Sequence, residues 1–452
     1  MSPLFFDPPR ANRFALRNVH VPSCLLETSH EAEAVGLSSV DLLVEDGVLS
    51  AVEAAGTLPA QLGPDLRHSM VLPGLVDCHT HLDKGHIWPR KPSPSGDVPG
   101  ASQATAEDRV ARWCAEDVRR RMEFGLMTAH ARGVVAIRTH LDSLAPQAAI
   151  SFPVFAEMRD RWAGRVELQV SSIAPLDIFL TEEGRLLADT VARTGGQLGC
   201  VTRFRSQPNE PLSPLFDAAM KRVFALANER GLNLDLHVDE SGDPNARTLL
   251  RVGQLAQILE FRGRILCGHC CSLAVQTDEV ILATLDACVD ARIDIVTLPT
   301  VNMYLQSRAA GVTPRWRGVT LVHEMKSRGL RVSVAGDNCR DPFYAYGDHD
   351  MLDTFVQAVK ILQLDHPLGD WIALATSTPA DVMDLGKCGR VHVGGAADLI
   401  VLKARNYSEM LSRAQSNRVV LRRGRPIDTT PPEYSLLDDL MFEAEGAPNH
   451  GL

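Results

Sequence analysis

Short runs of alternating apolar and polar residues characterise the first part of the chain, from about residue 13 to residue 72. Phe14–Val19 and Val40–Val52 have the alternation expected of half-buried strands. Within the second run, Glu45-Asp-Gly-Val48 places an Asp-Gly pair between apolar residues, which predicts a hairpin turn. We therefore expect the chain to begin with a small β-unit.

After Lys84 the pattern changes, and β-rich runs of about five to eight residues alternate with longer stretches of helical spacing. This alternation predicts βα units and a parallel sheet. We predict strands at Val71–Cys78, Val134–Thr139, Val166–Ser171, Leu198–Thr202, Asn233–Leu236, Arg264–Gly268, Ile293–Leu298 and Arg331–Gly336. Eight such strands predict an α/β fold of the (β/α)₈ TIM-barrel class.

Two connecting stretches carry helix signals. Ala106–Arg132 mixes charged and apolar residues at helical spacing, and Pro214–Arg230 is followed by Gly231, a natural residue after a helix end. Arg390–Pro426 returns to short strands and turns, and we expect it to complete the N-terminal β-unit.

The predicted domains follow from these patterns. Residues 1–71 and 386–428 form the two parts of a discontinuous β-domain, residues 72–385 form the barrel, and residues 429–452 form a tail. The tail is acidic and rich in proline, and it could pack as an extended arm on a neighbouring subunit of a homo-oligomer.

Composition narrows the classes of partner. The 452 residues are 45% hydrophobic, which allows a sizeable core, and the net charge of −10 offers no basic surface for nucleic acid or an anionic membrane. The N-terminus lacks a basic region followed by a long apolar run, so we expect a cytoplasmic protein without a membrane span. The ten cysteines are expected to be mostly reduced, buried thiols. A small molecule is the expected partner.

Candidate chemistry lies after the predicted strands, where the active residues of such barrels are found. His79 and His81 are separated by one residue, so on a strand both side chains point to the same side. His237 follows the fifth strand and Asp337 the eighth. Three histidines and one carboxylate predict a metal site with room for a water molecule. His140, after the second strand, is either a neighbour of this site or purely structural.

A bound metal ion makes hydroxide available at neutral pH, and the reaction then needs groups that move protons. Glu240, three residues beyond His237, is predicted to carry the proton, and Asp337 could also hold the water. His269, after the sixth strand, is predicted to orient the hydroxide or stabilise developing charge. Catalysis is thus assigned to Glu240, His269 and Asp337.

Other motifs offer weaker alternatives. Cys267-Gly-His-Cys-Cys271 has no second ligand pair at the spacing of a structural zinc site. The compact deaminase signature, H-x-E with P-C-x-x-C, is absent, and Gly195-Gly-Gln-Leu-Gly199 lacks the Lys-Ser/Thr that follows a phosphate loop.

Taken together, several ordered motifs resemble the amidohydrolase superfamily, and within it the cytosine-deaminase-like branch. They are Pro73–Lys84, His237-Val-Asp-Glu240, Gly268-His269, Val301–Arg308 and Gly336–Pro342. The resemblance implies a (β/α)₈ barrel with a flanking β-sandwich, and one Zn or Fe ion that serves hydrolysis of a C–N bond in a nitrogen heterocycle. It also implies His79, His81, His237 and Asp337 as metal ligands. Because Leu198–Phe204 contains no lysine, the subtype with two metals and a carbamylated lysine is not expected.

The motifs indicate the type of reaction more clearly than they indicate the substrate. Cytosine deaminases carry a glutamine after the third strand, where this chain has Ser171–Asp177, and paired aspartates after the eighth, where this chain has Asp337-Asn338. The Asp-Asn pair is similar to that of N-isopropylammelide aminohydrolases. We predict deamination of a heterocycle. Hydrolysis of a cyclic amide or of an N-alkylamino-triazine is the alternative, and a non-catalytic binding or assembly role is a remote one.

By position alone, six residues are expected around the substrate, and Lys84 and Asp83 are expected to form an ion pair beside them. The six candidates are Asn338, Trp88, Arg203, Phe204, Asn302 and Gln306.

Overall fold

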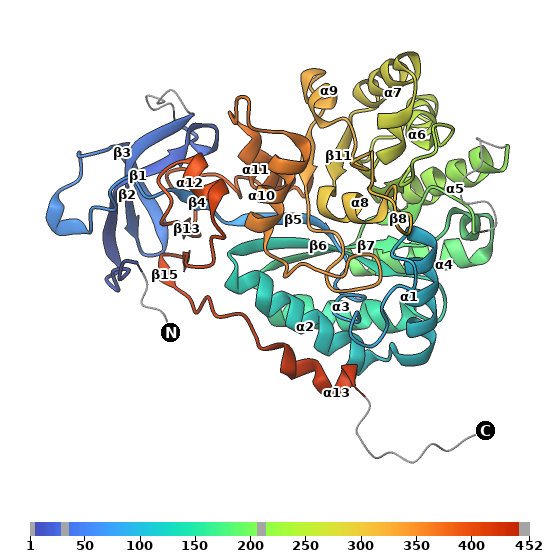
Figure 1. Cartoon of the computed structure of the whole chain (residues 1–452), viewed down its shortest axis with the longest axis horizontal. Coiled ribbons are helices and arrows are strands. Elements are labelled where there is room, and N and C mark those ends of the chain that lie inside the picture. Colours follow the sequence, from blue (N-terminus) through green and yellow to red (C-terminus); the bar gives the residue numbers. More distant parts are fainter. Residues whose placement is uncertain (1–4, 29–35, 206–213, 443–452) are drawn as a thin grey trace.

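Eight parallel strands form the centre of the larger part of the molecule (Figure 1). The structure is a computed structural model that describes residues 5–28, 36–205 and 214–442. Each of the eight predicted strands is present, with ends shifted by a few residues. The strands are β5 (Leu75–Thr80), β6 (Val134–Asp142), β7 (Glu167–Ile173), β8 (Leu198–Val201), β9 (Leu234–Val238), β10 (Ile265–His269), β11 (Ile293–Thr297) and β12 (Val332–Val334).

Backbone bridges close these strands into a ring. Strands β5 to β7 form one parallel sheet and β8 to β12 form another. The bridges Ser171–Gln197 and Pro175–Val201 join β7 to β8 on one side, and the bridge Thr80–Asp337 joins β5 to the end of β12 on the other. The predicted (β/α)₈ barrel is confirmed.

The first predicted strand, Val71–Cys78, is in fact two strands. Val71–Pro73 forms β4, which pairs antiparallel with β13 (Leu399–Val401) in the smaller part of the molecule, and only β5 belongs to the barrel. The change of partner occurs at Gly74, which donates its N–H to Asp398 O at 2.9 Å, while the next residue donates to Gly133 O. An unbroken apolar run does not reveal which neighbour each residue pairs with, because both environments are buried.

The smaller part is a sandwich of two antiparallel sheets. One sheet is β1 (Arg13–Pro22), β2 (Leu37–Glu45) and β3 (Val48–Ala54); the other is β15 (Arg425–Pro426), β14 (Val419–Arg422), β13 and β4. The predicted hairpin turn is present, with Asp46 and Gly47 both at positive φ. One buried cluster fills the space between the sheets, with side chains from both ends of the chain, including Phe14, Leu42, Val71, Leu399 and Leu421. The C-terminal strands β13 to β15 join this unit through the pairing of β13 with β4.

Helices surround the barrel and connect its strands (Figure 1). Helix α5 has the predicted bounds. Among the described residues, no helix is long and apolar enough to cross a membrane. The predicted helix Ala106–Arg132 is two helices that break at Trp113 and Cys114, where the Trp113 indole N–H turns back to Asp108 at 2.7 Å. The helices are α1 (Val98–Arg112), α2 (Ala115–Ala131), α3 (Ala148–Trp162), α4 (Glu182–Thr194), α5 (Pro214–Arg230), α6 (Thr248–Ile258), α7 (Asp278–Asp290), α8 (Pro299–Leu305), α9 (Val322–Ser327), α10 (Met351–Leu362), α11 (Ser377–Val382), α12 (Tyr407–Ser412) and α13 (Asp438–Met441).

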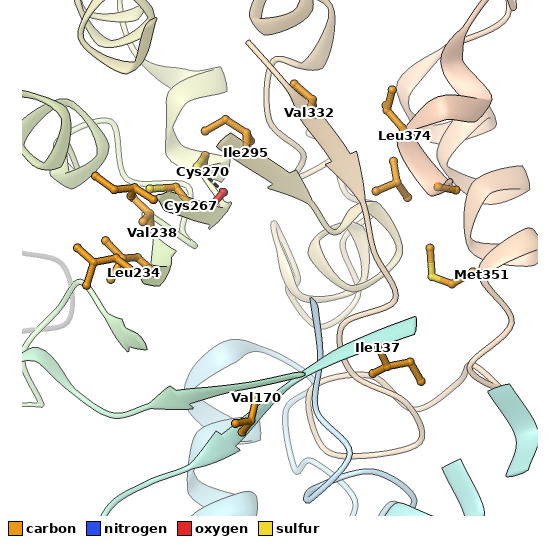
Figure 2. Packing of buried hydrophobic residues seen from close by; sticks show 14 of the residues in the cluster. Ile137, Val170, Leu234, Val238, Cys267, Cys270, Ile295, Val332, Met351 and Leu374 are labelled. Atoms are coloured by element: carbon orange, nitrogen blue, oxygen red, sulfur yellow. Dashed lines mark hydrogen bonds between the residues drawn. The ribbon is translucent and has the colours of Figure 1, made fainter. Parts of the chain in front are cut away.

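Alternation along each barrel strand separates packing from chemistry. In β9, Leu234, Leu236 and Val238 belong to the main apolar cluster, whereas Asp235 and His237 between them contact polar side chains. Figure 2 shows side chains of this cluster on successive strands, among them Leu234, Cys267, Ile295 and Val332. The rigid apolar packing holds the strand ends in place.

The described part of the C-terminal tail packs on its own chain. After an extended stretch it forms α13, and Leu437 and Met441 share a small buried cluster with Phe124 of α2. Asp439 also pairs with Arg120 of α2 at 2.5 Å. Leu437 and Met441 are thus covered by the chain's own α2, whereas Leu436 and Phe442 are 53% and 58% exposed, and contact of this segment with a neighbouring subunit stays a prediction.

Gly199 in β8 lies where no side chain fits, at the strand in which a two-metal relative would carry lysine. A Cβ there would lie 2.1 Å from Ser172 O and 2.5 Å from Asp235 O, which are backbone atoms of the neighbouring strands. Gly199→Ala is therefore expected to lower the free energy of unfolding by about 3 kcal/mol or more, read from the denaturant midpoint. Gly56→Ala is the control: a Cβ there meets nothing within 4 Å but φ is +84°, so the cost should be about 1 kcal/mol. Equal midpoints for the two variants would contradict the crowding described.

Candidate metal centre and substrate pocket

The predicted ligands meet at one point inside the barrel mouth. His79 and His81 lie at the end of β5, His237 lies in β9, and Asp337 follows β12. His79 and His81 have their Nε2 atoms 3.6 Å and 3.2 Å from Asp337 Oδ1, so both imidazoles point to the same side as expected. The Nε2 atoms of His81 and His237 are 3.4 Å apart.

These spacings fit a metal ion. Nitrogen and oxygen ligands about 2.0–2.2 Å from one ion lie roughly 3.3–3.5 Å from each other at tetrahedral angles. The three measured separations, 3.2, 3.4 and 3.6 Å, are close to that edge length. Both ring nitrogens of His79 and both carboxylate oxygens of Asp337 are buried without a hydrogen-bond partner. Unpaired buried polar atoms are costly, and a bound cation would satisfy one nitrogen of His79 together with the Asp337 carboxylate.

Burial also sets the protonation that a metal needs. Removal from water lowers the pKa of His79, His81 and His237 well below the ordinary value, so the imidazoles are neutral and keep a lone pair for a metal. Burial raises the pKa of Asp337 well above its usual range, and the charge of Glu240 adds to this. A divalent cation at this point would reverse that effect and favour the carboxylate.

His140 lies against the same group. Its ring centroid is 3.9 Å from that of His79, and its Nε2 is 3.2 Å from Asp235 Oδ1 of β9. Asp235 in turn accepts from Arg138 at 3.1 Å. His140 thus has a donor atom near the predicted ligands and a buried carboxylate on its other side. The sequence repeats Thr-His-Leu-Asp at 80–83 and at 139–142, which is the signal that relates His140 to His81.

The predicted acid–base residues flank the ligands. His269 Nδ1 is 3.5 Å from Glu240 Oε1 and 2.9 Å from Asn302 Nδ2. The Asn302 amide and the Glu240 carboxylate both lie on the Nδ1 side of His269, while its Nε2 is buried without a hydrogen-bond partner. His269 thus has one ring nitrogen, Nε2, that the described protein groups leave unpaired.

Asp239 anchors the loop that carries Glu240. Its carboxylate accepts from Thr248 Oγ1 at 2.6 Å and from Leu249 N at 3.0 Å, both at the start of α6. Gln306 Nε2 donates to the Glu240 backbone oxygen at 3.3 Å on the other side. No role is predicted for Asp239 from the sequence, because it lies nine residues before Thr248 and the N-cap position of α6 is Arg247.

A pocket of about 630 Å³ opens directly onto this group, and His81, His237, Glu240, His269 and Asp337 form its floor. Its walls combine apolar side chains with a few polar ones. The wall residues include Leu144, Ile173, Leu305 and Phe343, together with Asp97, Ser102 and Arg109 from the loop before α1 and from α1 itself. The contribution of α1 was not foreseen, because nothing in its sequence marks a helix as a wall of a site on other elements.

Of the six predicted substrate residues, Asn338, Arg203, Phe204 and Gln306 line this pocket. Asn302 does not; it is fully buried behind His269 and holds that ring. Trp88 is also not among the lining residues, and its backbone N–H donates to Arg340 O at 2.8 Å.

Lys84 pairs with Asp142, not with Asp83. Its Nζ is 2.9 Å from Asp142 Oδ1, while Asp83 accepts the backbone N–H of Asp142 at 2.8 Å. Burial disfavours the charge of Lys84, but Asp142 and Asp83 outweigh it and raise the pKa of the ammonium group. Asp83 and Lys84 lie in the turn after β5, and the Asp83 carboxylate is used by the Asp142 N–H, so the expected Lys84–Asp83 pair is replaced by Lys84–Asp142.

The chain matches proteins of known family. Residues 173–428 match a family model described as "Amidohydrolase family". A pterin deaminase from Rhizobium rhizogenes (strain K84 / ATCC BAA-868) is 46% identical over 443 residues, which cover 98% of this chain and 100% of that protein. An N-isopropylammelide isopropyl amidohydrolase from Pseudomonas sp. (strain ADP) is 23% identical over 371 residues, 80% of this chain and 87% of that protein.

Solved structures share the architecture. The crystal structure of 5-methylcytosine deaminase from Klebsiella pneumoniae liganded with 5-fluorocytosine has a TM-score of 0.78 at 21% identity, with 92% of this chain and 97% of that chain covered. N-isopropylammelide isopropylaminohydrolase from Burkholderia multivorans ATCC 17616 has a TM-score of 0.72 at 22% identity, with 92% and 98% covered. These likenesses support the fold.

Removing one predicted ligand should weaken metal binding. We expect His237→Ala to bind a divalent metal at least tenfold more weakly than the unaltered protein, because it deletes one corner of the donor group. Metal content after dialysis against a chelator, measured by elemental analysis, is the readout. His130→Ala in α2, which lies outside the donor group, is the control and should retain its metal. Full metal retention by His237→Ala would argue against His237 as a ligand.

Proposed function

The chain belongs to the amidohydrolase family, and we propose that it is a metal-dependent deaminase that hydrolyses the exocyclic amino group of a pterin. The observation that carries the proposal is the convergence of His79, His81, His237 and Asp337 below a pocket that also presents Glu240 and His269. The relative of 46% identity, matched over nearly the whole of both chains, supports the choice of a pterin.

A divalent ion, zinc or iron, held by these four residues would supply the Lewis acidity that activates water for attack. Glu240 reaches the pocket beside His269 and can take a proton from the attacking water. The same carboxyl group then delivers that proton to the ring nitrogen next to the attacked carbon. We assign His269 to stabilising the oxygen on which charge develops, and the contact between Asn302 Nδ2 and His269 Nδ1 holds the ring in place.

The atoms balance in a simple way. Water adds to the carbon that bears the amino group, the proton of the added hydroxyl group passes to the amine, and the C–N bond breaks to release ammonia. The products are the oxo-heterocycle and ammonia, so no oxidant or second substrate is needed. The buried floor excludes bulk water from competing for the proton.

The pocket suits a flat bicyclic ring better than a single small one. Its volume of about 630 Å³ lies in the range of pockets for larger ligands, and Phe204 and Phe343 provide aromatic wall surface. Gln306 places a side-chain amide on the wall although Ser171–Asp177 contains no glutamine. We assign Gln306, Arg203 and Asn338 to the polar edge of the ring. The proposed substrate therefore differs from a cytosine-like one in ring size. It is a larger ring that carries a related edge with an amino and an oxo group.

Glu240→Gln should lower kcat by about 10²–10⁴-fold, because an amide cannot carry the proton. The metal content should stay unchanged, since Glu240 is not one of the four proposed ligands. Steady-state ammonia release together with elemental analysis measures both. Glu279→Gln on the exposed start of α7 is the control and should keep full activity. Undiminished turnover by Glu240→Gln would exclude the role given to this residue.

A substrate panel tests the heterocycle. Ammonia release from pterin is expected to exceed that from cytosine and isocytosine in kcat/KM by at least about tenfold, since a single ring leaves part of the pocket wall uncovered. N-isopropylammelide is included because of the Asp337-Asn338 pair, with release of isopropylamine as its readout. Preference for the triazine, or ring opening without release of ammonia, would replace the pterin proposal.

A further inference from the structure

A second buried group of metal-binding side chains lies beside the main site. Among the described residues, three groups of histidine, cysteine or carboxylate atoms could hold an ion; two overlap at the main site, and the third is His86, Cys339 and His349. The donor atoms of this third group all lie within 4.8 Å of one another. The three residues are 2%, 3% and 8% exposed. The mechanism proposed above uses none of them.

Two loops bring these residues together. His86 lies on the loop after β5 and Cys339 on the loop after β12, and the His86 N–H donates to Cys339 O at 2.9 Å. Trp88 N–H donates to Arg340 O at 2.8 Å, which continues the pairing of the two loops. His349 follows shortly before α10.

The backbone around the group is arranged to turn the imidazoles inward. His86 and His349 both have positive φ, 67° and 48°, a backbone conformation that residues other than glycine seldom adopt. In α2, Gly125 leaves space for one of them, because a Cβ there would lie 3.0 Å from His349 Nε2.

The histidine nitrogens lack partners. Both ring nitrogens of His86 and Nε2 of His349 are buried without a hydrogen bond. An unpaired buried polar atom costs about 1–3 kcal/mol, so one nitrogen of each imidazole calls for a ligand here. Burial lowers the pKa of His86 well below its ordinary value and that of His349 to about 4, so both rings are neutral and can act as ligands.

We propose that His86, Cys339 and His349 form a second metal site, for Zn²⁺ or a similar borderline-soft divalent ion. Imidazole nitrogen and thiolate sulfur are both donors that zinc accepts in proteins, with the thiol proton leaving to solvent as the ion binds. Zinc ligands lie roughly 3.3–3.6 Å apart, so modest side-chain rotations within the present 4.8 Å limit close the site. A fourth position remains for water.

Nearby charges are compatible with a cation. Arg121 and Arg340 lie near His86, but Arg121 is paired with Asp117 at 2.6 Å and Arg340 is stacked on the Tyr434 ring at 4.0 Å. Asp348 acts electrostatically on both Cys339 and His349 and adds negative charge. An ion here would tie the loop that follows His79 and His81 to the loop that follows Asp337. Its role is to hold the main ligands in position.

Cobalt substitution tests the proposal, because the main site has only nitrogen and oxygen donors. The full-length protein, stripped of metal and loaded with Co²⁺, should bind about two ions per chain and show thiolate-to-cobalt charge-transfer absorption in the near ultraviolet. Cys339→Ala should bind about one ion and lose that absorption. Cys288→Ala, which removes a buried thiol of α7, is the control and should keep both ions and the absorption.

Three results of these experiments would contradict the second metal site. Saturation with cobalt without the charge-transfer absorption, or absorption that persists in Cys339→Ala, overturns the second site. If Cys339→Ala does not fold, His349→Gln replaces it, with at least about tenfold weaker binding of the second ion expected; unchanged binding also overturns the proposal. Neither readout depends on turnover of a pterin, so this inference and the proposed function fail independently.

Discussion

The bridge between Thr80 and Asp337 is the contact on which the site depends. Asp337 N donates to His79 O at 2.8 Å, and Thr80 Oγ1 donates to Asp337 O at 2.7 Å, so the first and last barrel strands are joined at the residues that carry the ligands. Asp77 accepts from the N–H groups of His79 and Gly336 just below. These bonds close the ring and set the distance between the ligands in the same step. A barrel that opened here would separate two imidazoles from their carboxylate.

The same burial that makes the ring rigid determines its chemistry. Water is excluded from the floor of the pocket, so the imidazoles are neutral and Asp337 lacks a compensating charge of its own. In a low dielectric an added divalent ion interacts strongly with that carboxylate. Lys84 shows the opposite case, because two neighbouring carboxylates keep it charged in spite of its burial.

Some features could be predicted from sequence because they depend on short-range periodicity. The His79-Thr-His81 spacing determines that both rings point to one side of a strand, whatever the rest of the fold does. The eight strands were found because apolar runs alternate with helical spacing, and His237, His269 and Asp337 were found because strand ends of a barrel share one face. The division of Val71–Cys78 between two sheets was missed, since both halves are buried and only the hydrogen-bond partners differ.

What the sequence by itself determined is therefore the class of fold and the set of residues at the open end of the barrel. Local alternation and chain order are sufficient for both. Only the tertiary structure decided that Asn302 holds His269 instead of lining the pocket, that Lys84 pairs with Asp142, and that His86, Cys339 and His349 meet. The physical reason is that these contacts join loops that are distant in sequence. Their geometry arises from ring closure and side-chain packing, which leave no periodic trace along the chain.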